Sequence, residues 1–451
     1  MNSPVVTVAG GKRSPWLRAP LLVAAGFVFA IALGSWLLSR DAAVVAGHVP
    51  LTWTRALFMA TSATCVTGLT VVDVANGLSP FGQVVLLALI QVGGLGIMTL
   101  AFLVLLALGG ETKAGGDVLQ STLGDLVSHY HPRRALTMVL GSTLALELLG
   151  ALVLLPQIHE PHGLWKALFV SVSAFCNAGF DNLEHGLAPY GGHWGVCLPL
   201  MLLWLVGGLG FIVPAALLVK RQRGDSVPLD MSASMILRAS ALLIPLGALL
   251  FWLTERGGLL ADRPANEQVL LCLFHGSTTR TAGFAALDYG QASRATLLTQ
   301  IGFMLVGGAP CSTAGGMKVT AVWVFAAALW SRLLNRDQVL IGRRAVPVSA
   351  IRHATIICVF MMVAAAVLAA AVAIVEPRLP FDAVTFEVAS ALCTVGLSTG
   401  ITPALSPDAE LLLVLAMFVG RIGPLGFLYA FVRIGARRAA VRFPQSDVCV
   451  G

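Results

Sequence analysis

Residues 61–73 read TSATCVTGLTVVD, and the chain repeats the pattern of this stretch three more times. The later copies contain FCNAGF at 175–180, TRTAGF at 279–284 and CTVGLS at 393–398. In each copy a short, partly apolar segment leads into a loop of small residues that contains a glycine. Repeated loops of this kind predict one structural unit that the chain uses four times.

The loop glycines place the four copies in one register. They are Gly68, Gly179, Gly283 and Gly396. Six residues before each glycine stands a serine: Ser62, Ser173, Ser277 and Ser390. Five residues after it, three copies have an acid and the fourth has isoleucine: Asp73, Glu184, Asp288 and Ile401. Several coincidences in one register favour a true internal repeat.

A second signature follows each loop glycine and begins 23–27 residues further along the chain. It reads VGGLG at 92–96, VGGLG at 206–210, VGGAP at 306–310 and VGRIG at 419–423. Glycine pairs within a membrane helix allow close packing or bending. In the fourth copy Arg421 replaces the second glycine of the pair.

The composition indicates lipid as the solvent of this chain. Of its 451 residues, 57% are hydrophobic and 11% are charged, whereas soluble proteins carry about 25% charged residues. The net charge of +7 does not indicate nucleic acid, because most Lys and Arg lie in short loops between apolar stretches. The eight cysteines are scattered without a C-x-x-C pair, so we expect reduced thiols and neither disulfides nor a metal site.

Long and short apolar segments alternate along the chain. The eight long ones are predicted to span the bilayer: 17–39, 81–108, 135–156, 195–219, 234–254, 296–330, 350–375 and 409–432. The four short ones lie between successive pairs: 53–64, 164–175, 267–278 and 381–392. At about 12 residues each, they are too short to cross about 30 Å of hydrocarbon and suit re-entrant half-helices.

The expected fold class is therefore an all-α polytopic membrane protein. It has four pseudo-repeated units of transmembrane helix, pore helix with loop, and transmembrane helix, around a central pore. We place the first helix and pore loop of repeat 1 in 1–80, its second helix and cytoplasmic loop in 81–133, repeat 2 in 134–230, repeat 3 in 231–345 and repeat 4 with a cytoplasmic tail in 346–451. The Lys- and Arg-rich side holds both termini and should be cytoplasmic. The acidic outer side would concentrate cations.

The four loops suit a cation filter. A cation that crosses a bilayer must exchange water for protein oxygens, and backbone carbonyls supply these without net charge. Glycine permits the backbone angles that aim successive carbonyls at one axis. The candidate filter residues are Thr64, Cys65, Val66, Thr67 and Gly68; Cys176, Asn177, Ala178 and Gly179; Thr281, Ala282 and Gly283; and Thr394, Val395 and Gly396.

The stretch GGAPCSTAGG at 307–316 interrupts the sixth span and suggests a gate. It lies about as far beyond Gly283 as Arg421 lies beyond Gly396, so both should sit just below the filter. The hypothesis is that the loop obstructs the cavity, and that Arg421 and Lys318 hold it by donating to loop carbonyls or hydroxyls. A structural tie without gating is the alternative. The candidate gate residues are Gly307, Gly308, Ala309, Pro310, Cys311, Ser312, Thr313, Ala314, Gly315, Gly316, Lys318 and Arg421.

These motifs resemble the Trk/Ktr/HKT superfamily of potassium transporters, and most closely the bacterial Ktr-type membrane subunits. The segments that carry the resemblance are 61–73, AFCNAGFD at 174–181, STTRTAGF at 277–284, TVGLSTGITP at 394–403, GGAPCSTAGGMK at 307–318 and GRIGPLGF at 420–427. The resemblance extends over nearly the whole chain. One departure is Cys311 in the interrupted helix, where the resemblance leads us to expect a residue such as glycine.

The resemblance implies K⁺ as the permeant ion, without an organic cofactor. Glycine in all four copies accompanies K⁺ selectivity in such proteins, and serine in the first copy accompanies a preference for Na⁺. The residues implied to contact K⁺ are Val66, Thr67, Gly68, Asn177, Ala178, Gly179, Ala282, Gly283, Val395 and Gly396. The resemblance also maps an intramembrane loop onto 307–316 and a basic residue onto Arg421.

Partners and location follow from the same resemblance. It implies a homodimer in the bacterial inner (plasma) membrane, multi-pass, with both termini cytoplasmic and one pore in each protomer. It also implies a cytoplasmic RCK-type regulatory subunit, KtrA/TrkA-like, that binds a nucleotide such as ATP/ADP or NAD and gates the pore.

Two other classes of protein were weighed. A Na⁺- or H⁺-coupled secondary cation transporter also uses broken helices, but inverted repeats would be expected, whereas these four copies run in the same order. The sequence leaves channel-like and coupled transport open. An enzyme would need clustered nucleophiles and acids, which the membrane segments lack.

Overall fold

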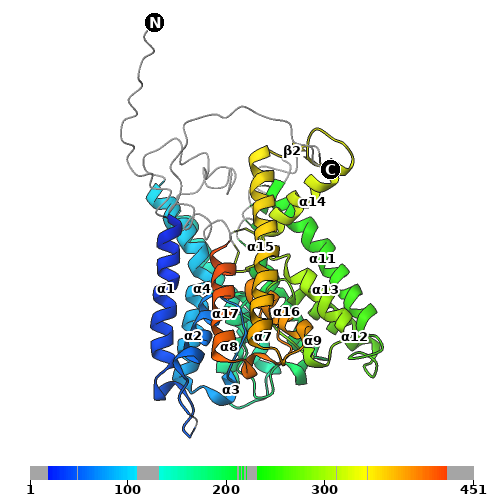
Figure 1. Cartoon of the computed structure of the whole chain (residues 1–451). Coiled ribbons are helices and arrows are strands. Elements are labelled where there is room, and N and C mark those ends of the chain that lie inside the picture. Colours follow the sequence, from blue (N-terminus) through cyan, green and yellow to red (C-terminus); the bar gives the residue numbers. More distant parts are fainter. Residues whose placement is uncertain are drawn as a thin grey trace.

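The structure, a computed structural model, describes residues 19–47, 49–108, 132–210, 213–214, 216–217, 220, 231–310, 312–342 and 344–423 (Figure 1). Cys311 and the distal end of the predicted span 409–432 lie outside these residues. The described part is almost entirely helical.

The first half of the chain contains two helix pairs, each with a shorter helix between its members. In the first pair these are α1 (Ala19–Leu38), α2 (Trp53–Thr64), the single turn α3 (Val74–Gly77) and α4 (Pro80–Leu108). In the second pair they are α7 (Pro132–Leu154), α8 (Gly163–Phe175) and α9 (Trp194–Leu209). Short 3-10 turns η2 (Asp41–Ala43), η3 (Leu155–Gln157) and η4 (Ala188–Tyr190) lie in the connections.

The second half has the same order of elements. Its third group contains α11 (Met231–Glu255), α12 (Ala265–Thr278), η5 (Tyr289–Gln291), α13 (Arg294–Met304) and α14 (Val319–Leu333). Strands β1 (Leu340–Ile341) and β2 (Arg344–Ala345) form a small antiparallel hairpin. The fourth group contains α15 (Val348–Val375), α16 (Phe381–Leu392), η6 (Thr402–Ala404) and α17 (Pro407–Ile422).

Two details differ from the sequence prediction, and one agrees with it. The predicted span 195–219 is not one helix, because α9 ends at Leu209 and Gly210 takes a left-handed φ of +64°. The interruption predicted at 307–316 within the span 296–330 is present, since residues 305–318, where glycines and Pro310 cluster, separate α13 from α14. The hairpin β1–β2 is an exception to the expected all-α class.

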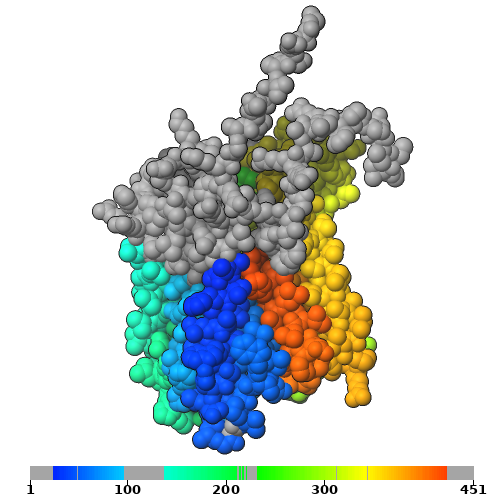
Figure 2. All heavy atoms as spheres, turned by 60° about the vertical axis from the view of Figure 1, so that its left-hand side comes forward, coloured from blue at the N-terminus to red at the C-terminus, as the bar shows by residue number. Residues whose placement is uncertain are grey.

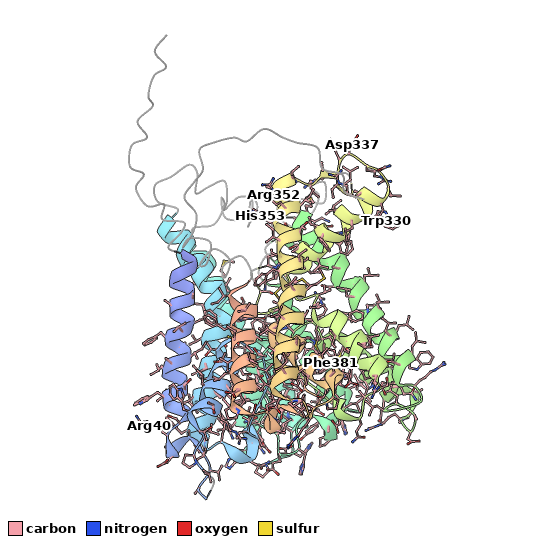
Figure 3. The ribbon with its side chains drawn as sticks, in the orientation of Figure 1. Arg40, Trp330, Asp337, Arg352, His353 and Phe381 are labelled. Carbon is pink, nitrogen blue, oxygen red and sulfur yellow. The ribbon has the colours of Figure 1, made fainter. Side chains whose placement is uncertain are left out.

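Long apolar helices mark the chain as a membrane protein. Within the described residues, three helices are long and apolar enough to cross a bilayer by length and composition: 137–157, Met231–Glu255 and Val348–Val375. Figure 3 shows Trp330, Asp337, Arg352 and His353 at the end of the molecule that carries the hairpin, whereas Arg40 and Phe381 lie toward the other end. The apolar helices run between these two ends (Figure 1).

The four groups of helices close into a ring. The helix that follows each short helix packs against the short helix of the next group: α4 on α8, α9 on α12, and α13 on α16. The last contact, α17 on α2, joins the fourth group to the first. Figure 2 accordingly shows α17, in orange-red, beside the blue helices of the N-terminal group.

Candidate functional site

The loops after α2, α8, α12 and α16 share an unusual backbone. Their glycines all have a left-handed φ: Gly68 at +98°, Gly179 at +71°, Gly283 at +79° and Gly396 at +97°. The residue two positions earlier is also left-handed in every copy: Val66 at +56°, Asn177 at +59°, Thr281 at +69° and Thr394 at +50°. Such angles are rare for β-branched residues and cost about 1–3 kcal/mol each. Alternating handedness turns successive carbonyls toward the same side, instead of the two sides of an ordinary strand.

The glycines of the four loops meet in a ring. A Cβ added to Gly68 would lie 3.1 Å from Gly179 Cα, and one added to Gly179 would lie 2.9 Å from Gly283 Cα. A Cβ on Gly283 would lie 3.2 Å from Gly396 Cα, and one on Gly396 would lie 3.0 Å from Gly68 Cα. Each loop therefore approaches the next so closely that a side chain would force the backbones apart.

Hydrogen bonds from the short helices hold the loops in place. The residue before the glycine donates its N–H to the carbonyl of the repeated serine in three copies: Thr67 to Ser62 at 2.7 Å, Ala178 to Ser173 at 2.7 Å, and Val395 to Ser390 at 2.8 Å. The serine hydroxyl also accepts from the glycine N–H in the first and fourth copies, at 3.2 Å and 3.0 Å. In the third copy Thr278 Oγ1 instead donates to Phe284 O at 2.8 Å. The repeated serine thus holds the loop by hydrogen bonds in the first, second and fourth copies.

Several hydroxyl groups in these loops make no hydrogen bond within the described part of the chain. Thr64, Thr67, Thr281 and Thr394 are buried, and their Oγ1 atoms lack a hydrogen-bond partner within the described part of the chain. Buried polar atoms are normally satisfied. These oxygens are therefore available to a cation that has shed its water, together with the loop carbonyls.

The second glycine signature marks a contact between two helices. A Cβ on Gly93 would collide with Thr64 O, one on Gly207 with Phe175 O, and one on Gly420 with Leu392 O. Each of these carbonyls lies four residues before the loop glycine of its own copy. The signature thus lets the following helix touch the last turn of the short helix. In the third copy the helix is broken, and Gly307 faces Gly315 O instead.

Substitution of Gly93 by alanine is expected to destabilise the fold, because the new methyl group would overlap the Thr64 carbonyl. Overpacking of this kind costs about 1–3 kcal/mol, which thermal unfolding of the purified protein should register as a lower melting temperature. Gly26→Ala is the matched control, since Gly26 is an exposed residue of α1 with no atom within 4 Å of its added Cβ. Equal melting temperatures for the two variants would contradict this explanation.

The break between α13 and α14 docks its backbone against the second group of helices. Ala309 N donates to Gly208 O at 3.0 Å, and Thr313 N donates to Gly207 O at 3.4 Å. Thr313 Oγ1 donates to Phe175 O at 3.3 Å. With its amide nitrogen turned toward this site, Asn177 donates to Thr313 Oγ1 at 3.0 Å. The broken segment thus contacts Asn177, a predicted filter residue of the second copy.

The same segment contacts the fourth copy and its arginine. A Cβ on Gly315 would collide with the Thr394 side chain. Arg421 is 5% exposed; its Nη1 donates to Thr313 O at 2.6 Å and its Nη2 donates to Gly93 O at 2.9 Å. Lys318 Nζ donates to Ala314 O at 2.6 Å. The structure therefore brings the predicted gate residues Thr313, Arg421 and Lys318 together, next to the predicted filter loops.

One polar cluster behind the second loop was not recognised in the sequence. Gln91 Nε2 donates to Glu147 Oε2 at 2.8 Å, and Cys176 Sγ donates to Gln91 Oε1 at 3.1 Å. Ser171 Oγ donates to the Glu147 carbonyl at 2.6 Å. Within the described residues Glu147 has no ion pair. Gln91 thus links Glu147, a buried acid of α7, to Cys176, a predicted filter residue.

Comparison with known proteins gives consistent matches over nearly the full length. The family model TrkH, described as cation transport protein, matches residues 5–436. The Ktr system potassium uptake protein B of Bacillus subtilis (strain 168) is 32% identical over 460 residues, which is 99% of this chain and 100% of that protein. The protein of the same name from Vibrio alginolyticus is 32% identical over 99% of this chain and 98% of its own length.

A third relative and a solved structure extend the comparison. The potassium/sodium uptake protein NtpJ of Enterococcus hirae is 30% identical over 95% of this chain and 96% of its own length. The crystal structure of the potassium transporter TrkH from Vibrio parahaemolyticus superposes with a TM-score of 0.72 at 18% identity, and covers 93% of this chain and 85% of that one. At this identity the superposition shows a shared fold.

Proposed function

This chain belongs to the TrkH family of cation transport proteins, and from this premise we propose that it is the pore-forming subunit of a potassium uptake system. The observation that carries the proposal is the ring of Gly68, Gly179, Gly283 and Gly396, in which four loops with the same left-handed backbone meet. The two full-length relatives at 32% identity are named potassium uptake proteins. The arrangement is that of a transport protein.

In the proposed mechanism, dehydrated K⁺ passes through the ring of loops. Its water shell is replaced by carbonyl groups of the four filter strands and by four threonine hydroxyls. These hydroxyls have no hydrogen-bond partner among the described residues: Thr64, Thr67, Thr281 and Thr394. Four repeats that supply eight transmembrane helices form the path. The short helices end at the loops, so the negative ends of their dipoles favour a cation there.

Gating is assigned to the broken segment 307–316. Its contacts with Asn177, Thr394 and Arg421 put it beside the filter, where it obstructs the path in the closed state. The hairpin end carries Arg336, Arg344 and Arg352 and is placed on the cytoplasmic side of the bacterial inner membrane, with both chain termini. A nucleotide-binding RCK-type subunit would act from that side on a homodimer of this chain.

The proposal predicts that this chain restores rubidium and potassium uptake in a bacterial strain that lacks its own potassium transporters. Uptake should rise well above that of the empty strain, and K⁺ should compete with rubidium more strongly than Na⁺ does. An uptake rate indistinguishable from that of the empty strain, with the protein present in the membrane, would refute the proposal.

The name of the Enterococcus hirae relative includes sodium, which keeps a Na⁺- or H⁺-coupled transporter as the second candidate. Proteoliposomes separate the two mechanisms. Channel-like K⁺ flux should follow the membrane potential when no Na⁺ or proton gradient is present. Flux that requires either gradient would favour coupled transport.

A further inference from the structure

The four copies differ in how they hold the segment after the loop glycine. In the first copy Asp73 Oδ1 accepts from Ala75 N at 2.8 Å, and in the third copy Asp288 Oδ1 accepts from Gly290 N at 2.9 Å. In the second copy Glu184 pairs with Lys166 at 3.2 Å. The fourth copy has Ile401 at this position and lacks a carboxylate of this kind.

A different carboxylate takes this place in the fourth copy. Glu387 lies in α16, three residues before Ser390, and is 1% exposed. Its Oε1 accepts from Ser398 Oγ at 2.6 Å, from Thr399 N at 2.9 Å and from Thr399 Oγ1 at 3.2 Å. Its Oε2 accepts from Thr402 Oγ1 at 2.8 Å. All four hydrogen bonds come from residues 398–402, directly after Gly396.

The corresponding residues of the other copies are apolar and buried: Met59, Val170 and Phe274. Only the fourth short helix therefore places an acid behind its loop. A buried carboxylate is costly unless it is fully hydrogen-bonded, and charge-assisted hydrogen bonds are about twice as strong as neutral ones. Donors face both Glu387 oxygens, so every hydrogen bond at this site depends on the carboxylate as an acceptor.

Residues 398–402, to which Glu387 is hydrogen-bonded, and the following Pro403 also contact two other copies. A Cβ on Gly290, in the third copy, would lie 2.9 Å from Thr399 O. Arg55, in the first copy, donates through Nη2 to Pro403 O at 3.3 Å. Movement of residues 398–402 would therefore shift Gly396, two residues earlier, and change the contacts of the neighbouring loops.

We propose that Glu387 is a positioning residue that fixes the fourth filter strand and so contributes to selectivity for K⁺ over Na⁺, replacing the carboxylate that Ile401 lacks. The inference rests on the proposed function of the ring as a K⁺ filter. Glu387→Gln keeps the shape of the side chain but replaces one acceptor oxygen with an NH₂ group, which cannot accept a hydrogen bond. Glu387→Ala removes every acceptor.

The experiment measures the ratio of K⁺ to Na⁺ permeability of the full-length protein in proteoliposomes, with unfolding temperature recorded in parallel. We expect both substitutions to lower the ratio on the order of tenfold, the size of effect that follows the loss of a hydrogen bond to a charged group. Asp408→Asn is the matched control, because Asp408 is an exposed acid in the first turn of α17. The control should keep the wild-type ratio.

A residue that only supports the fold would lower the unfolding temperature and leave the permeability ratio unchanged; that result for folded Glu387→Gln overturns the inference. If the Glu387 variants do not fold, the permeability ratio is measured for Ser398→Ala and Thr402→Val, which each remove one donor. Wild-type ratios in both would also overturn it. If wild-type protein itself shows no K⁺-selective flux, the proposed function fails instead, which the wild-type measurement reveals separately.

Discussion

Gly68→Ala is expected to reduce potassium flux by about a hundredfold or more. At a φ of +98° Gly68 has a conformation that residues with a side chain rarely adopt. The added Cβ would lie 2.5 Å from Ala178 O and 3.1 Å from Gly179 Cα. Strain of about 3 kcal/mol, shared between backbone and clash, corresponds to about a hundredfold.

The four glycines of the ring should be equally sensitive to an added methyl group. Gly179, Gly283 and Gly396 each face the backbone of the next loop, so alanine at any of them should give the same loss. Rubidium uptake into the transport-deficient strain measures the effect. The folded control is Gly26→Ala, which adds the same methyl group in open space.

A serine variant at Gly68 or Gly283 should also shift the preference between K⁺ and Na⁺. If both serine variants keep the wild-type preference, the filter assignment is wrong.

The positions of the loop glycines could be predicted from the sequence because only glycine accommodates such an approach between backbones. The left-handed residues two positions earlier could not be predicted. Val66, Thr281 and Thr394 are β-branched, and their type argues against a positive φ. Closure of the ring imposes that conformation, and no local signal in the sequence reports it.

The break in the third copy was predicted at the right place, since glycines and a proline in an apolar span oppose a helix. Its partners were predicted only in part. That Arg421 should reach the loop followed from the internal register, but its second acceptor, Gly93 O, belongs to another copy. The contact of the loop with Gly207 and Gly208 likewise depends on how the copies pack.

Buried acids were the least predictable part of the site. The sequence showed that Ile401 interrupts the series of acids, and it gave no sign that Glu387 supplies a carboxylate from the helix instead. Glu147 received no role from the sequence, because Gln91 and Cys176, its partners in the structure, lie far from it along the chain. Hydrogen bonds of this kind are set by tertiary packing.

Arg421→Met is expected to raise steady-state potassium flux, provided that the broken segment is the gate. Arg421 donates to Thr313 O of that segment and to Gly93 O of the first copy, so it links the segment to the first copy. A hydrogen bond to a charged group is worth about 1.5–3 kcal/mol. Loss of both bonds should therefore shift the balance between closed and open states by about a hundredfold or more. Arg421→Lys is the matched control, since it keeps the charge and should retain one carbonyl contact, with a smaller rise in flux.

Deletion of residues 308–314 tests the same gate without touching the arginine. Gly307 and Gly315 already lie in contact, with the Cβ position of Gly307 3.1 Å from Gly315 C, so the two ends left by the deletion start close together. The deletion removes Thr313 and its contact with Arg421, and flux should rise as in Arg421→Met. Unchanged flux in both folded variants would mean that the segment is a structural tie. A rise in flux in both variants, with the selectivity for K⁺ over Na⁺ preserved, would separate the proposed gate from the proposed filter. All four copies contribute to the proposed filter, whereas the proposed gate consists of the broken segment of the third copy and Arg421 of the fourth.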